Sequence, residues 1–193
     1  INTVVYRKGD RHEISFTLEQ STLPAVRAVY PEFEQVDYEV FGGLVVMNLS
    51  LNHIGLMIKN SPNLMAYSDP EKQQEPALII TNVLPNSQAQ KTRSLFPGGI
   101  VTEVNDVPVK TVADFRAAVA QGKNSKYLTL RVMDRLVDRM LVVLPVDKVV
   151  ADESMLAMRH YYQPSKLAAV FSDRMPLMAR KQESSMNQSP SCA

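Results

Sequence analysis

The chain has 193 residues, of which 45% are hydrophobic and 21% charged, and its formal net charge is +1. These values are typical of a globular protein, and the balanced charge does not indicate binding to nucleic acid or to an anionic membrane. The one cysteine, Cys192, excludes an internal disulfide framework and a cysteine-based zinc site. No apolar run reaches the roughly 18 to 20 residues of a membrane helix, so we expect no membrane insertion. Because the first residue is Ile1 rather than Met, we expect a piece of a longer protein.

Residues 1–20 predict a β-hairpin around a Lys8-Gly9-Asp10 turn. Hydrophobic residues of the second arm alternate with polar ones: Ile14, Phe16 and Leu18. An isolated hairpin is only marginally stable in water. We therefore expect it to pack on the rest of the chain or to be the end of a preceding domain. Residues 21–38 contain prolines and an acidic run, which indicates a linker.

Residues 39–150 contain short apolar runs separated by turn residues, the pattern of a strand-rich domain. The expected strands are 44–47, 77–84, 100–104, 127–133 and 140–146, with a short helix within 88–95. Residues 52–59 fit either a helix or a strand, and 60–75 are expected to form a polar loop.

A second helix is predicted between Thr111 and Gly122. The Thr111 side chain can accept hydrogen bonds from amides of the first turn, and Gly122 can end the helix. The residues expected on its buried face are Val112, Phe115, Ala118 and Val119.

The remaining residues predict a helical extension over 151–179 and a disordered tail over 180–193. Asp152 is the expected cap of the first helix, and Pro164 is expected to interrupt the extension. The residues expected to face inward or to continue the apolar stripe are Met155, Leu156, Met158, Leu167, Val170, Phe171 and Met175.

Two stretches, 82–89 and 96–115, resemble the core of PDZ domains in HtrA/Deg-type serine proteases. The chain looks closest to the second PDZ domain of the plant-type Deg branch, which has an entry like Phe41-Gly42-Gly43-Leu44 and a terminal segment like 155–165. Residues 4–18 look like the closing hairpin of the first PDZ domain. The sequence departs from the pattern at Asp106, where a turn glycine is usual, and at Gly99, where an acidic residue is usual.

The resemblance implies an α+β fold: a PDZ-like, partly open β-barrel with two helices over residues 39–150, plus the N-terminal hairpin and the C-terminal helical extension. Successive amides at Gly42 and Gly43 can converge on a carboxylate, and the strand that follows can accept a peptide by β-augmentation. The predicted peptide-binding residues are Phe41, Gly42, Gly43, Leu44, Val45, Val46, Phe115 and Val119. The alternative is that the two glycines form only a strand-entry turn and that Val119 is core.

No catalytic residue is expected in this chain. His12 is expected on a solvated face, His53 in a surface or capping role and His160 in local packing; none has a matched serine or a metal-ligand spacing. The chain also lacks a Gly-Asn-Ser-Gly-Gly-type nucleophile loop. We expect no metal and no cofactor.

The expected function is that of a non-catalytic peptide-binding or assembly region of an HtrA/Deg-like serine endopeptidase. Its partners would be peptide or unfolded-protein C-termini and sister subunits of a homo-oligomer. One alternative is an adaptor or scaffold PDZ protein without a protease domain, and another is an oligomerisation module whose groove is filled by its own chain. The sequence leaves the compartment open: the periplasm for a bacterial protein, an organelle or the nucleus for a plant-type one.

Overall fold

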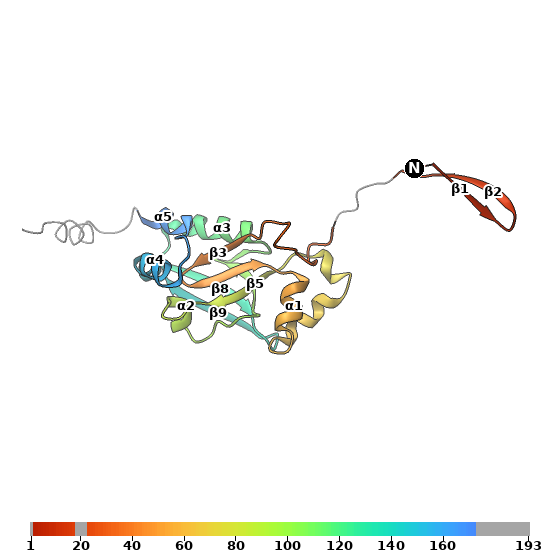
Figure 1. Ribbon diagram of the computed structural model, residues 1–193. Helices are drawn as coiled ribbons and strands as arrows, with labels where there is room; N and C mark the ends of the chain where they lie inside the picture. The colour runs from red at the N-terminus through yellow and green to blue at the C-terminus, as the bar shows by residue number, and fades with distance from the viewer. Residues whose placement is uncertain (1, 18–22, 173–193) are drawn as a thin grey trace, which may run out of the picture.

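The computed structural model describes residues 2–17 and 23–172. Seven strands form one antiparallel sheet in the order β3-β4-β5-β6-β8-β9, with β7 paired to β6 (Figure 1). The strands are β3 (Tyr38–Phe41), β4 (Leu44–Asn48), β5 (Leu78–Val83), β6 (Ile100–Val104), β7 (Val107–Pro108), β8 (Tyr127–Met133) and β9 (Arg139–Pro145). This arrangement, with its helices, confirms the expected α+β fold.

Five α-helices accompany the sheet: α1 (Leu51–Met57), α2 (Gln88–Lys91), α3 (Val112–Gln121), α4 (Val146–His160) and α5 (Lys166–Ser172). Three short 3-10 helices lie at η1 (Pro62–Ser68), η2 (Lys72–Gln74) and η3 (Gly122–Asn124). The expected polar loop over 60–75 is therefore largely 3-10 helix, and 52–59 is helical. No helix of the described ranges is long and apolar enough to cross a membrane.

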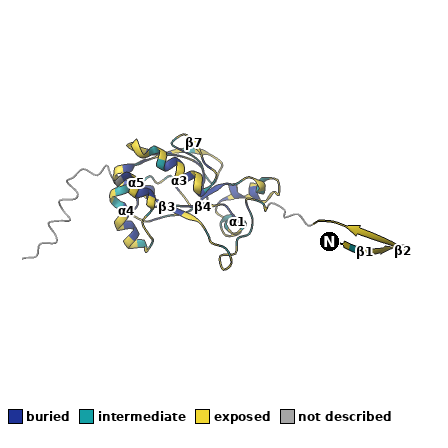
Figure 2. Cartoon of the chain, turned by 90° about the horizontal axis from the view of Figure 1, so that it is seen from above, coloured by how far each residue is buried: buried dark blue, intermediate teal, exposed yellow. Residues whose placement is uncertain are grey.

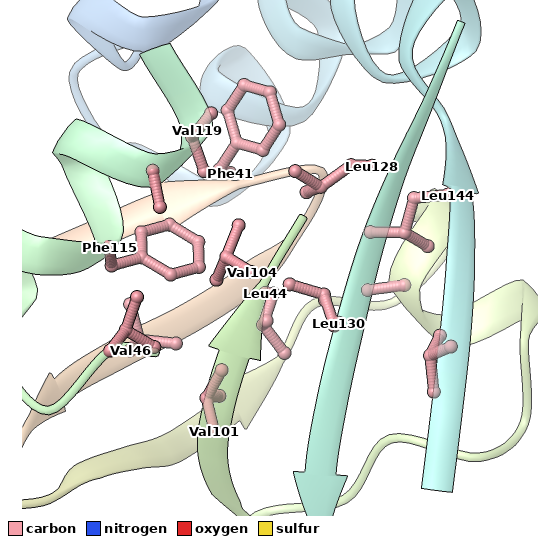
Figure 3. Close-up of a cluster of buried hydrophobic side chains, with 14 of the residues drawn as sticks. Phe41, Leu44, Val46, Val101, Val104, Phe115, Val119, Leu128, Leu130 and Leu144 are labelled. Atoms are coloured by element: carbon pink, nitrogen blue, oxygen red, sulfur yellow. The ribbon is translucent and has the colours of Figure 1, made fainter. Parts of the chain in front are cut away.

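The main core lies between the sheet and helices α2 to α5. Figure 3 shows Phe115 and Val119 of α3 pointing toward side chains of the sheet, among them Val46 and Val104. The buried face of α3 is the predicted one: Val112, Phe115, Ala118 and Val119. Its cap is also confirmed, because the Thr111 side chain accepts from the Asp114 amide at 3.1 Å.

A second buried cluster lies on the opposite face of the sheet, because Ile79 lies between Leu78 and Ile80 of the main core. It gathers apolar residues of β5, β6, α1, η1 and adjoining loops with one residue from the expected linker: Val26, Leu49, Ile54, Leu64, Tyr67, Ala77, Ile79 and Ile100. Val26 is fully buried, and its amide donates to the Gln73 carbonyl at 2.9 Å. Part of the segment between the N-terminal hairpin and β3 thus packs on the domain.

The N-terminal hairpin consists of β1 (Asn2–Arg7) and β2 (Asp10–Ser15), paired from Asn2↔Ser15 to Arg7↔Asp10. It forms a separate two-stranded sheet. Its residues are almost all exposed, including the apolar Val4 and Ile14 (Figure 2). The predicted hairpin is confirmed, whereas Leu18 lies outside the described residues.

The C-terminal helices differ in detail from the expectation. Helix α4 begins at Val146, directly after β9, so Asp152 lies inside the helix and does not cap it. The prediction that Met155 and Met158 face inward is wrong, because the buried face of α4 runs through Val149, Glu153 and Leu156 and leaves both methionines exposed. Pro164 lies between α4 and α5, as expected. Of the other stripe residues, Leu156, Leu167 and Phe171 are buried, Val170 is exposed, and Met175 lies outside the described residues, as does segment 180–193.

Candidate peptide-binding groove

Strands β3 and β4 form a hairpin through a two-residue turn at Gly42 and Gly43. Their φ angles are +62° and +83°, and Phe41 pairs with Leu44 across the turn. Two consecutive positive φ values are typical of a turn that matches the twist of antiparallel strands and strongly favours glycine. The Gly-Gly sequence therefore directs β3 back along β4.

The turn is enclosed between α2 and α4. A Cβ atom added at Gly43 would lie 2.0 Å from the Ser87 Cβ, and one at Gly42 would lie 3.1 Å from a Val149 methyl group. The Gly42 carbonyl accepts from the Ala89 amide at 3.0 Å. The Gly43 carbonyl accepts from the Leu84 amide at 2.8 Å. The side of Gly43 that faces Ser87 thus has no room for a further group.

Both edges of β4 are occupied by strands of the same chain. β3 pairs with it from Tyr38↔Met47 to Phe41↔Leu44, and β5 pairs with it on the other side. An added peptide strand needs a free row of amides and carbonyls. β4 therefore offers no such row while β3 is in place.

The structure brings the predicted site residues together around this hairpin. Phe115 and Val119 of α3 pack against the hairpin, and Figure 3 shows Phe41 beside Val119 and Val46 beside Phe115. Gly42 and Gly43 are buried in the turn, and Val45 is half-buried. The apolar side chains of α3 thus contact the hairpin of their own chain.

Arg116 clamps β3 to α3. Its Nε donates to Glu39 Oε2 at 2.6 Å, while Nη1 and Nη2 each lie 2.8 Å from an oxygen of Asp37. Nη2 also donates to the Tyr38 carbonyl at 2.8 Å. The hydrogen bond to Asp37, followed by the interactions with Glu39, raises the pKa of Arg116 above its ordinary value. Sequence patterns did not predict this clamp, because Arg116 is 77 to 79 residues from its acidic partners along the chain.

A sequence model of the PDZ domain family matches residues 30–166, more than two thirds of the chain. The chain belongs to the PDZ domain family. This family is consistent with peptide binding. No curated protein matches the chain.

The C-terminal segment of the PDZ domain packs against the outer side of β3. Ser165 joins two buried carboxylates: its Oγ donates to Glu39 Oε1 at 2.6 Å, and its amide donates to Glu153 Oε1 at 3.2 Å. The Tyr162 hydroxyl donates to the same Glu153 oxygen at 3.3 Å. Phe171 of α5 lies 5.8 Å from the Phe41 ring, centroid to centroid. Segment 162–171 thereby holds the hairpin from the side opposite β4.

Glu153 is the most deeply buried carboxylate of the described chain, with 2% of its surface exposed. Burial raises its pKa, which the hydrogen bonds from Ser165 and Tyr162 only partly offset. Its second oxygen, Oε2, makes no hydrogen bond within the described residues. The neutral acid is thus favoured at this position relative to an exposed glutamate.

A cavity lies next to β3, on the side of this strand that faces away from β4. The cavity has a volume of about 480 Å³ and is lined by Tyr38, Glu39, Val40, Arg116 and residues 163–167. In an antiparallel hairpin of this register, the backbone groups of Tyr38 and Val40 point away from β4. Because Arg116 donates a hydrogen bond to the Tyr38 carbonyl, the outer edge of β3 is only partly available to another strand.

Of the three histidines, His53 has the expected capping role and His12 the expected exposure, whereas the expected local contact of His160 is wrong. His53 Nδ1 accepts from the Ser50 amide at 3.1 Å and lies 2.9 Å from Ser50 Oγ, so it caps α1; burial lowers its pKa. His12 is exposed. His160 reaches the distant Pro85 carbonyl at 3.3 Å. No group of metal-ligating residues is found within the described ranges.

Proposed function

We propose that this PDZ domain is an assembly module of an HtrA/Deg-like serine endopeptidase, in which β3 occupies the place of a peptide ligand. The observation that carries the proposal is the pairing of β3 with residues 44–47 of β4, beside α3. A ligand strand in a PDZ groove would use this same edge. In this proposal, β3 of the same chain takes the position that a peptide ligand would have on β4.

The contacts around β3 support a permanent occupant rather than a removable lid. The strand is continuous with β4 through the Gly42-Gly43 turn, so its effective concentration at the edge is very high. Arg116 and Ser165 then hold Glu39 from two sides. A free peptide would have to displace all of these contacts at once.

Peptide titration tests this part of the proposal. Hydrophobic C-terminal peptides, as free acids and as amides, are titrated with the chain by fluorescence anisotropy, and a peptide-binding PDZ domain serves as the positive control. An open groove would bind the acids near the micromolar range, about −8 kcal/mol. We expect no saturable binding to the chain. Micromolar binding of the acid with weaker binding of the amide would contradict the self-occupied groove and support an open receptor.

The protease context rests on the resemblance of residues 82–89 and 96–115 to HtrA/Deg PDZ domains. An upstream sequence that contains a Gly-x-Ser-Gly-Gly loop after a histidine and an aspartate would support it. The natural polypeptide should then cleave unfolded casein, whereas the 193-residue chain alone should not. An upstream region without these elements would favour the adaptor class. Cleavage that follows the purified short chain would overturn its non-catalytic role.

A further inference from the structure

The last strand of the sheet, β9, presents an unpaired edge. It is the terminal strand of the sheet order, and no strand of the described chain pairs with its outer side. The opposite terminal strand, β3, is flanked by Arg116 and residues 163–167. Helices α2 and α4 contact β9, but no described strand occupies its outer edge.

The hydrogen bonds at the two ends of the β8–β9 ladder define which groups point outward. The Val146 amide donates to the Lys126 carbonyl at 3.0 Å, and the Asp134 amide donates to the Asp138 carbonyl at 2.9 Å. Bonded pairs alternate with non-bonded pairs in an antiparallel ladder, so the even-numbered residues of β9 bond to β8. The amides and carbonyls of Leu141 and Val143 therefore point away from the sheet.

The side chains of these two residues are also exposed. Leu141 has 59% and Val143 has 46% of its surface exposed, whereas Val142 and Leu144 are buried between them. Exposed edge strands usually carry a charge, a proline or a bulge that prevents pairing. In β9 the charge and the proline lie only at the two ends, Arg139 and Pro145. Residues 140–144 between them contain neither, and their pairing with β8 is regular.

We propose that two copies of this chain associate through β9, antiparallel about a two-fold axis at Val142, to form one continuous sheet. Leu141 of each copy then faces Val143 of the other, and both residues use their outward amides and carbonyls. Arg139 faces Pro145 of the second copy, where the Arg139 amide can donate to the Pro145 carbonyl. Because Pro145 has no N–H, the Arg139 carbonyl receives no hydrogen bond, so the ladder ends at this pair on each side. The dimer would be one form of the assembly that we propose as the function, and its biological role rests on that proposal.

The strand is self-complementary, which favours a second copy over an unrelated peptide. A two-fold axis at Val142 brings Leu141 and Val143 of both copies together on one face, with Arg131 and Thr129 of β8 beside them. One strand pair with four apolar side chains belongs to the small interfaces, below about 1,200 Å². We therefore expect a weak dimer that forms at high protein concentration.

Sedimentation equilibrium of the full chain, from about 10 µM to about 1 mM, tests the inference in the range expected of such interfaces. The wild type should shift from 21.6 kDa toward twice this mass. Leu141→Lys should weaken the association at least about tenfold, because it places like charges near the axis. The matched control is Leu56→Lys, which changes an 82% exposed leucine on α1 and should leave the association unchanged.

Amide hydrogen exchange of the wild type provides a second readout that does not depend on a variant. Exchange at Leu141 and Val143 should slow as the concentration rises, while Val142 is already protected by β8. A monomer at 1 mM would overturn the inference, as would a dimer that survives Leu141→Lys or a dimer without this alternating protection. The peptide titration addresses β3 and β4 only, so failure of the dimer and failure of the self-occupied groove are separate results.

Discussion

Two of the β-hairpins of this chain, β1–β2 and β3–β4, have closely similar local design and opposite surroundings. β1–β2 turns at Lys8 and Gly9, with φ of 53° and 92°, and β3–β4 turns at Gly42 and Gly43, with φ of 62° and 83°. The first hairpin is exposed along nearly its whole length, and the second is enclosed by α2, α3, α4 and α5. The turn chemistry explains both hairpins, but only packing explains why one of them is enclosed and the other exposed.

The largest difference between the hairpins should appear when an aromatic ring is removed. Phe41 is fully buried against α3 and α5, so Phe41→Ala should lower the free energy of unfolding by about 3 to 5 kcal/mol. Tyr6 in β1 is exposed, and Tyr6→Ala should change it by less than about 0.5 kcal/mol. Urea denaturation of both variants measures the two values. Equal small losses would mean that β3 is not part of the core.

The turn glycines give the next largest contrast. Gly9 and Gly43 both have positive φ, so alanine strains the backbone at either position by about 1 to 2 kcal/mol. A Cβ at Gly9 meets nothing within 4 Å, whereas at Gly43 it would overlap Ser87. Gly43→Ala should therefore cost about 2 to 4 kcal/mol in the main transition. Gly9→Ala should leave that transition in place; a matching loss for both variants would contradict the enclosed turn.

The sequence predicted most of the fold, because alternation and turn residues report local structure. The strands around 77–84, 100–104 and 127–146 and the cap at Thr111 all follow from such patterns. The sequence did not predict the start of α4 at Val146, since β9 runs into the helix without a turn or a polar cap. It also did not predict the burial of Val26, which depends on η2.

The predicted site residues do not all share one environment. Phe41, Phe115 and Val119 belong to one buried cluster, whereas Gly42 and Gly43 lie against Val149 and Ser87. Whether the edge of β4 holds a peptide or β3 depends on tertiary contacts, above all those of Arg116 with Asp37 and Glu39. Local patterns carry no information on ion pairs between residues so far apart in the chain.

Ion pairs provide a third contrast between the hairpins. Arg116→Met removes the clamp and leaves the buried Glu39 with Ser165 as its remaining partner, which should cost about 1 to 3 kcal/mol. The control is Arg11→Met in β2, which breaks an exposed pair with Glu13 and should cost less than about 1 kcal/mol. The melting temperatures of both variants, measured in low and in high salt, distinguish the two ion pairs. A clamp as weak as the exposed pair would mean that β3 is held by apolar contacts alone.

The smallest expected effect concerns pH, and it sharpens the comparison because only the enclosed hairpin lies near a buried carboxylic acid. Burial raises the pKa of Glu153 above its ordinary value of 4.5. Its contribution to stability is therefore complete below pH 4.5 and is lost as the pH rises through the folded pKa. Glu153→Gln keeps the acceptor for Ser165 and Tyr162 without the charge. It should raise the melting temperature at pH 8 by about 2 to 4 °C.

The same variant should differ less from the wild type at pH 4, where the carboxyl retains its proton. Tyr162→Phe is the matched control, because it removes a hydrogen bond to Glu153 without changing the acid itself. A wild type whose stability rises from pH 5 to pH 8 relative to Glu153→Gln would show that the carboxylate, and not the acid, is the favoured form.

Hydrogen exchange at the β4 amides tests the central claim most directly, that β3 occupies the edge of β4. In the observed register, the amides of Leu44 and Val46 bond to β3, so they should exchange as slowly as the deepest amides of the core. The amides of the exposed β1–β2 hairpin should exchange much faster, and adding a hydrophobic free-acid peptide should change neither group. If Leu44 and Val46 exchange as fast as the β1–β2 hairpin, and slow only when the peptide is added, the groove is open and the account is wrong.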